Sequence, residues 1–212
     1  MSNADLILDM YNQYNETSRD DIVAALNAAI FLGKIKKIAV DRYEALPKIT
    51  KRSKHTVMSW FNRPDKKIPL IDLCMIADYL QYNIFSFFKI KNNNGDNDIK
   101  DIAQDFLMKN EVCNVNYPLN NASIFIKAFN LQCNTNKNIV LDNVERYYGS
   151  TDEVLAHHSN KRQNTVMNVC GCTKHTYYSW FNRSRANVHI PLIDLCKLAI
   201  NVNIDVFEWF AE

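Results

Sequence analysis

One block of cationic and hydrogen-bonding side chains occurs twice in this chain of 212 residues. It reads KHT, then two variable residues, then SWFNR, and it begins at Lys54 and again at Lys174. Ammonium and guanidinium groups attract anions, while hydroxyl, amide and imidazole groups form hydrogen bonds. The block is therefore suited to binding an anionic partner such as a row of phosphates.

The repeat extends beyond this block. Residues 54–88 and 174–210 share KHT, SWFNR, IPLIDLC and an aromatic ending in the same order, about 120 residues apart. The second copy has two additional residues after Arg183, so that Pro69 pairs with Pro191. Such ordered self-similarity indicates an internal duplication. The segments that precede the two copies show no evident match.

Positive charge gathers near both copies, although the whole chain has a net charge of only +2. Residues 34–67 hold eleven basic and three acidic residues, and residues 161–185 hold five basic residues and no acidic one. Two basic stretches on a nearly neutral chain favour two local contacts with anions, such as phosphates. Two solvated helix faces are the alternative interpretation.

Composition and periodicity predict that helices position these groups. Hydrophobic residues make up 47% of the chain, and there are only four Gly and five Pro, which disfavours a turn-rich β fold. We expect leading helices, from apolar residues spaced three to five apart, over Asp5–Tyr14, Asp20–Val40, 98–108, 122–129 and 140–148. We expect loops at 110–121 and 130–138.

Each copy of the repeat predicts its own local structure. Ser53 and Thr173 precede KHT and are suited to cap a helix. In that helix Val57, Trp60 and Phe61, with their counterparts Tyr177, Trp180 and Phe181, form an apolar face, so the tryptophans are expected in the core. A basic loop, an apolar helix (70–80 or 192–200) and an aromatic segment that closes the core follow.

These residues resemble the lambda-repressor-like, or XRE-type, helix-turn-helix proteins. The first copy supplies Ser53, Thr56, Val57, Trp60, Asn62, Pro69, Leu70, Leu73, Ile76, Ala77 and Leu80, and the second supplies Val166, Gly171, Thr173, Thr176, Trp180, Asn182, Pro191, Leu192, Leu195, Leu198 and Ala199. The first copy departs from the family in having Lys51 where the turn glycine is usual, and in having Pro47, so that its second helix must start near Pro47 or be distorted. The second departs in having Tyr177 and Tyr178.

The resemblance implies an all-α fold with two tandem helix-turn-helix domains and additional N-terminal helices. The motifs cover about 41–90 and 163–211. The domains are then 1–92 and 99–212, and they are joined by a linker at 93–98, within the polar run KNNNGDND.

The resemblance also implies a sequence-specific regulator of transcription, a repressor, that binds double-stranded DNA. A cytoplasmic location is expected because no targeting segment is evident. Recognition helices would read similar half-sites one duplex turn (~34 Å) or a multiple apart. Base edges would be read by Lys54, His55, Ser59, Lys174, His175 and Ser179. The DNA backbone would be contacted by Thr56, Asn62, Arg63, Lys66, Lys67, Thr176, Asn182, Arg183 and Arg185.

Two alternatives concern partners. The fold could serve as a protein-binding module, such as an antirepressor or a phage-encoded inhibitor. The aromatic tail 207–210 or the N-terminal helix could pair two copies as a homodimer, whereas closure of the core is the other interpretation of the tail.

Other classes of function find little support in the sequence. It has no Walker loop, G-x-G-x-x-G or G-x-S-x-G, so we expect neither an enzyme nor a cofactor, and no small-molecule ligand is inferred. Cys170 and Cys172 are too close for a common zinc knuckle with His55, His175 or His157–His158, so no metal is expected. Cys74 and Cys196 are typical of core residues. No signal peptide or membrane span is evident.

Overall fold

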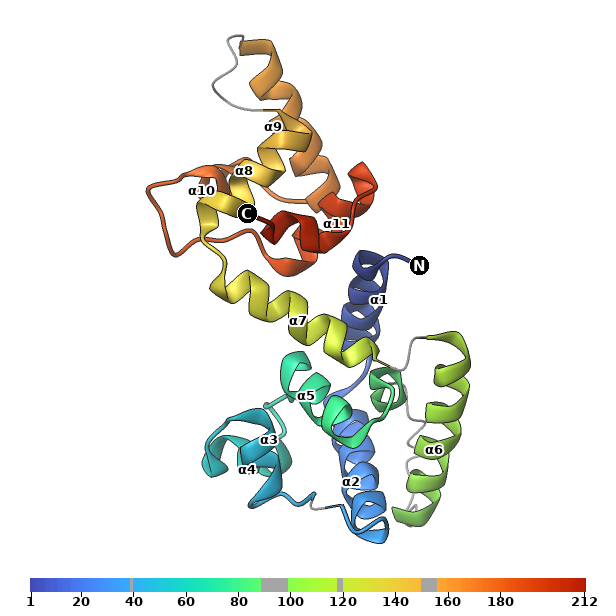
Figure 1. Ribbon diagram of the computed structural model, residues 1–212. Helices are drawn as coiled ribbons and strands as arrows, with labels where there is room; N and C mark the ends of the chain where they lie inside the picture. The colour runs from blue at the N-terminus through green and yellow to red at the C-terminus, as the bar shows by residue number, and fades with distance from the viewer. Residues whose placement is uncertain (39, 89–98, 118–119, 150–155) are drawn as a thin grey trace. The chain divides into compact units, whose positions relative to one another are not determined.

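The computed structural model describes residues 1–38, 40–88, 99–117, 120–149 and 156–212, without the side chains of 114–116 and 156–160. All regular structure in these ranges is helical, which confirms the all-α expectation (Figure 1). The α-helices are α1 Asn3–Glu16, α2 Arg19–Ile35, α3 Ala45–Thr50, α4 Lys54–Asn62, α5 Leu70–Leu80, α6 Ile99–Asn116, α7 Asn121–Asn134, α8 Lys137–Tyr148, α9 Ala156–Cys170, α10 Lys174–Phe181 and α11 Leu192–Val202. Two 3₁₀ helices are η1 Ile84–Phe87 and η2 Val206–Phe210.

The chain packs as two units whose limits fall inside helices. The middle unit comprises residues 9–126, and the composite unit comprises residues 1–8 together with 127–212. This division differs from a boundary at 93–98, because α6 packs against α2 and η1 within the middle unit. The expected linker, 93–98, lies outside the described residues.

Helix α2 ends at Ile35, so the prediction that it continues to Val40 is wrong. Lys37 adopts a left-handed backbone (φ 56°), and the amide of Ile38 donates to the carbonyl of Gly33 at 2.8 Å. These are features of a helix C-terminus that reverses the chain. A Cβ on Gly33 would lie 3.2 Å from the Cβ of Val40, so the glycine permits the returning chain to approach closely.

Two segments expected as loops are partly helical. Helix α6 continues to Asn116, α7 continues to Asn134 and α8 begins at Lys137, so the predicted loops are wrong over 110–116, 121, 130–134 and 137–138. Asparagine has only a modest helix penalty, which tertiary contacts override. One such contact is the Asn110 side chain, whose oxygen accepts from the amide of Asn83 at 2.8 Å.

The aromatic ends of the two copies close the cores of their units. Phe87 and Phe88 are buried in the middle unit, and Trp209 and Phe210 are buried in the composite unit. The indole of Trp209 donates to the carbonyl of Leu195 at 2.9 Å. This confirms core closure as the role of the tail.

The duplication extends to the leading helices, which the sequence alone did not show. The hydroxyl of Tyr14 on α1 donates to the carbonyl of Ile68 at 3.0 Å, and the amide of Gln132 on α7 donates to the carbonyl of Ile190 at 2.8 Å. Positions 14 and 132 lie at the same place in two 14-residue helices. Helices α1 and α2 therefore correspond to α7 and α8, with an offset of 118 residues.

The first turns of α1 and α7 are exchanged between the copies. Asn3 on α1 donates to the carboxylate of Asp205 at 2.7 Å, which places the start of the first copy in the composite unit. Asn121 on α7 donates to the side chain of Asn83 at 2.6 Å in the middle unit. Asn3 corresponds to Asn121 and Asn83 to Asp205, so the same interaction joins each leading helix to the other copy.

Candidate functional site

In each unit the repeated block begins a helix after a tight turn. In the middle unit α3 ends at Thr50, Lys51 adopts a left-handed backbone (φ 57°), and the hydroxyl of Ser53 accepts from the amide of Thr56 at 3.1 Å. Pro47 is the third residue of α3, in the first turn, where proline is tolerated. Lys51 thus takes the conformation that usually selects glycine.

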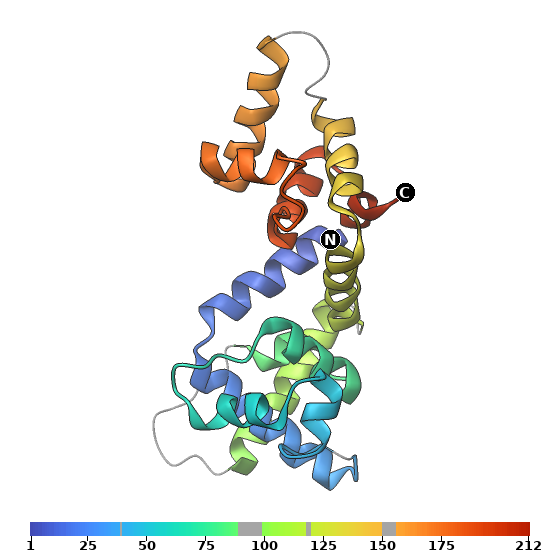
Figure 2. The same cartoon turned by 90° about the vertical axis from the view of Figure 1, so that its left-hand side faces the viewer.

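The composite unit repeats this turn with a glycine. Helix α9 ends at Cys170, Gly171 is left-handed (φ 67°), and Thr173 accepts from the amide of Thr176 at 3.2 Å. Figure 2 shows α9 meeting α10 at this sharp bend. The predicted caps, Ser53 and Thr173, are confirmed in both copies.

The inner faces of α4 and α10 are fixed in the cores. Val57 and Trp60 of α4, and Tyr177 and Trp180 of α10, are all at most 5% exposed. The two tryptophans are therefore core residues, as predicted. Because these anchors fix the rotation of each helix, the opposite side of its first turn faces solvent.

The predicted base-reading residues lie at that first turn or just after it. Lys54, His55, Lys174 and His175 are exposed, and Ser59 and Ser179 are partly exposed. Within the described chain, the side chains of Lys54 and His55 have no hydrogen-bonding or ionic partner. The Lys174 ammonium lies 5.8 Å from the ring centroid of Tyr178. Ser59 donates to the carbonyl of Thr56 at 2.7 Å.

The predicted backbone-contacting residues of the middle unit fall into two groups. Thr56, Asn62, Arg63 and Lys66 are exposed. Lys67 instead points into the protein, where its ammonium donates to the carbonyls of Tyr14 at 2.6 Å and Thr17 at 2.8 Å. Burial lowers the pKa of Lys67. Its ammonium is thus held at the end of α1, although the residue is partly exposed.

In the composite unit the corresponding cations have protein partners. Arg183 donates to Asp142 at 2.7 Å and to Glu145 at 3.0 Å, and its hydrogen bond to Asp142 is the main cause that raises its pKa. Arg185 lies 3.3 Å from the hydroxyl of Ser179. Thr176 is partly exposed, and Asn182 is exposed with its side-chain oxygen accepting from Ser184. The charge of Arg183 is thus neutralised by carboxylates of α8.

Sequence reasoning also missed the fate of Arg162, which it counted among the surface charges. Arg162 is only 3% exposed and forms an ion pair with Glu145 at 3.2 Å. Its counterpart in the middle unit, Arg42, is partly exposed. Arg162 lies 120 residues after Arg42, which is the spacing of the repeat. This spacing was the signal in the sequence that the two arginines correspond.

Residues that could hold a metal or act as nucleophiles are dispersed. In the described ranges no three His, Cys, Asp or Glu side chains gather as metal ligands, and the His157 and His158 side chains lie outside those ranges. Cys74 and Cys196 are buried, as expected of core residues. Burial raises the pKa of Cys196 to about 12, which disfavours the reactive thiolate.

Comparisons with family models, curated proteins and solved structures give no match to this chain. Among the described helices, none combines the length and the apolar character that crossing a membrane requires. The first turns of α4 and α10, here called the two helix tips, are therefore the candidate functional site.

Proposed function

We propose that this protein is a sequence-specific, double-stranded DNA-binding regulator of transcription, built from two helix-turn-helix units of the lambda-repressor-like class. The observation that carries the proposal is the exposure of cationic and hydrogen-bonding side chains on the first turn of α4. There Lys54 and His55 are exposed on a helix that is capped by Ser53 and anchored by buried Trp60. A rigid helix with free donors at its N-terminal turn is suited to enter a major groove.

Roles follow from the position of each side chain. Lys54 would donate to guanine O6 and N7, and His55 and Ser59 would contact neighbouring base edges. Thr56, Asn62, Arg63 and Lys66 would bind phosphates and fix the register. In the composite unit Lys174, His175 and Ser179 would read a similar half-site, because the two tips carry the same residues.

The two units should contribute unequally to affinity. Arg63 has no ionic partner within the described residues, so its guanidinium can meet a phosphate directly. Arg183 must exchange its contacts with Asp142 and Glu145 for a phosphate. Because that exchange replaces one anion by another, its net gain is smaller. The middle unit is therefore proposed as the stronger DNA-binding unit.

The decisive experiment is the selection of bound duplexes from a random pool, repeated over a salt series. We expect one enriched sequence, with affinity falling about tenfold or more between 50 and 200 mM salt. Lys54→Ala and Lys174→Ala should each relax base preference at one position, at a cost of about 1–3 kcal/mol. Arg146 is an exposed cation on α8, so Arg146→Ala is the charge-matched control. It should change neither the base preference nor the affinity for DNA.

A pool without enrichment, from a folded protein, would contradict the proposal. So would equal affinity for all duplexes in the wild type and in both lysine variants. Either result would favour the alternative that the helix-turn-helix units bind protein.

A further inference from the structure

An arginine occupies the same place in both copies, against the last turn of the repeated helix. The guanidinium carbon of Arg42 lies 4.2 Å from the ring centroid of Phe61, and that of Arg162 lies 4.9 Å from the ring centroid of Phe181. Arg162 lies 120 residues after Arg42, and Phe181 lies 120 residues after Phe61. The two arginines can therefore be compared partner by partner.

In the composite unit this arginine, Arg162, has a carboxylate partner and two further hydrogen-bond acceptors. Arg162 pairs with the carboxylate of Glu145 at 3.2 Å and donates to the hydroxyl of Tyr177 at 2.8 Å and the carbonyl of Gly149 at 2.7 Å. It is buried, and Glu145 is itself only 13% exposed. A planar guanidinium binds a carboxylate through charge-assisted hydrogen bonds, which is the pairing seen here.

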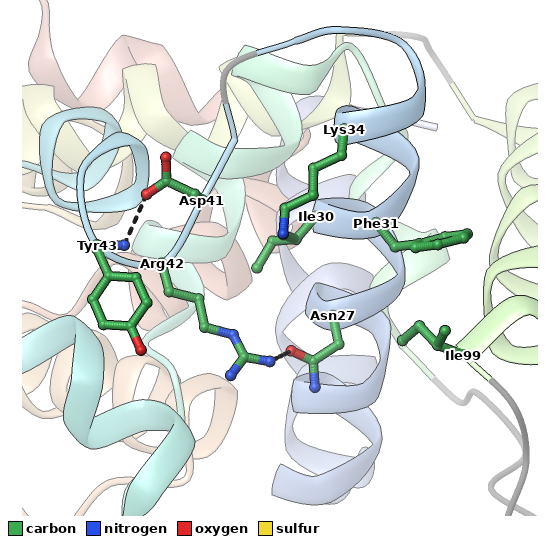
Figure 3. Close-up of a pocket in the computed structure, with 8 residues that line it drawn as sticks. All are labelled: Asn27, Ile30, Phe31, Lys34, Asp41, Arg42, Tyr43 and Ile99. Carbon is green, nitrogen blue, oxygen red and sulfur yellow. Dashed lines mark hydrogen bonds between the residues drawn. The ribbon is translucent and has the colours of Figure 1, made fainter.

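In the middle unit the same positions lack the anion. Asn27 stands where the composite unit has Glu145, at the offset of 118 residues, and Val57 stands where it has Tyr177, at the offset of 120. Arg42 donates to the side-chain oxygen of Asn27, as Figure 3 shows. No carboxylate of the described residues forms an ion pair with Arg42.

The neighbouring carboxylate, Asp41, accepts hydrogen bonds from backbone amides. Its Oδ1 accepts from the amides of Tyr43 at 2.9 Å and Glu44 at 2.7 Å, and it is drawn turned toward that backbone in Figure 3. The hydrogen bond from Glu44 is the largest cause that lowers the pKa of Asp41, and the charge of Lys34 lowers it further. Asp41 therefore caps the approach to α3, and none of the carboxylates that the structure describes pairs with the guanidinium of Arg42.

A cavity of about 390 Å³ lies beside Arg42. Lys34 and Arg42 bring two cations to it, against the single acidic residue Asp41. Its remaining walls are largely apolar, from Ile30, Phe31, Ile99 and the ring of Tyr43 (Figure 3). This volume is within the ~300–1,000 Å³ of small-molecule sites, and the wall combines apolar surface with a few polar groups, as such sites do.

We propose that this cavity binds a small organic carboxylate. Its carboxylate group pairs with Arg42 as the carboxylate of Glu145 pairs with Arg162 in the other copy, with Lys34 nearby, and its apolar part contacts Phe31 and Ile99. The duplication supplies the reason for this chemistry, because one copy carries its own carboxylate and the other has an open cavity. The proposal is independent of DNA binding.

The test uses the full chain, with benzoate as the probe and benzyl alcohol and inorganic phosphate as comparators. Binding is followed by calorimetry and by the NMR signal of the Arg42 side-chain N–H. We expect benzoate to bind saturably and to shift that signal, and benzyl alcohol to bind at least about tenfold more weakly, since it lacks the charge. A phosphate affinity above that of benzoate would overturn the assignment to a carboxylate.

Two variants test the site itself. Asn27→Glu places the carboxylate of the other copy beside Arg42 and should weaken benzoate binding at least about tenfold, without unfolding the unit. In the control Asn27→Gln, the new side chain has the size of glutamate without its charge. This variant should retain more affinity for benzoate than Asn27→Glu. The proposal is overturned if benzoate binds the folded Asn27→Glu protein as tightly as wild type, or if wild type does not bind benzoate at all.

Discussion

The ammonium of Lys67 lies 4.2 Å from the centroid of the Tyr14 ring and donates to the carbonyl of the same residue at 2.6 Å. A second bond runs to the carbonyl of Thr17, beyond the end of α1 at Glu16. A cation at the C-terminus of a helix compensates the partial negative charge of its free carbonyls. One lysine of the basic loop thus holds the loop to α1, while its neighbour Lys66 is exposed.

We therefore expect Lys67→Met to change the stability of the protein and Lys66→Met to change its affinity for DNA. Lys67→Met removes two charge-assisted hydrogen bonds and should lower the free energy of unfolding by about 2–3 kcal/mol. Lys66→Met should change stability by less than about 0.5 kcal/mol. Instead it should reduce the salt dependence of DNA affinity by about one phosphate contact. Denaturant melts and salt titrations separate the two effects, and equal losses of stability would contradict this assignment.

A second prediction concerns the buried carboxylate of Asp72, which Arg52 contacts at 3.0 Å. Burial raises the pKa of Asp72, and the hydrogen bond and charge of Arg52 oppose that rise. Arg52→Gln leaves the carboxylate buried without its partner. We expect a loss of about 2 kcal/mol at pH 7, less than for a fully buried pair, because the Arg52 side chain is 46% exposed.

This loss should depend on pH in a defined direction. In the variant, the folded-state pKa of Asp72 rises further above its unfolded value, so the folded protein takes up the proton first as the pH falls. The difference from wild type is therefore full at pH 7 and shrinks as the pH falls through that folded-state pKa. Melting curves from pH 7 to 4 measure it, with Asp72→Asn as the control. A penalty that grows on acidification would refute the interpretation.

The third prediction compares Arg63 with Arg183. Because Arg63 lacks an ionic partner among the described residues and Arg183 has two, Arg63→Ala should weaken binding to all duplexes more than Arg183→Ala does. The salt slope should likewise fall by about one for Arg63→Ala and by less for Arg183→Ala. Asp142→Asn, which releases one partner of Arg183, should strengthen binding. Equal effects of the two arginines would argue against unequal units.

The fourth prediction follows from the exchanged helix starts. Asn3→Ala removes the bond to Asp205 and should increase hydrogen exchange in η2, about 200 residues away in sequence. Asn121→Ala should do the same for η1, because its partner is Asn83. Amide exchange measured by mass spectrometry resolves these segments. Increased exchange confined to the mutated helix would show that the exchanged contacts carry little stability.

The fifth prediction concerns the six thiols. Cys133 is exposed and should react first with a thiol reagent, whereas buried Cys74, Cys170 and Cys196 should react only after unfolding. Burial raises the pKa of both Cys170 and Cys196 to about 12, so little thiolate forms and their labelling should stay far slower than that of Cys133 at both pH 7 and pH 9. Peptide mapping after timed labelling measures each rate. Rapid labelling of Cys196 in the native protein would contradict the described core.

Local features of the sequence were sufficient for much of this structure. The caps at Ser53 and Thr173, the apolar faces around Trp60 and Trp180 and the all-helical class all follow from interactions within a few turns of one helix. The duplication was visible for the same reason, since its strongest blocks encode those local interactions. The candidate tips were predictable because capping and the apolar face together determine which residues must face outward.

Only the tertiary structure decided which charges are available. Lys67 contacts Tyr14, Arg183 contacts Asp142 and Arg162 contacts Glu145, and each partner lies on a different element from the cation. Whether a cation faces solvent depends on the acceptors that folding brings beside it, which helical periodicity does not record. The exchange of the first turns of α1 and α7 was hidden likewise, because a helix start carries the same apolar pattern whichever copy it packs against.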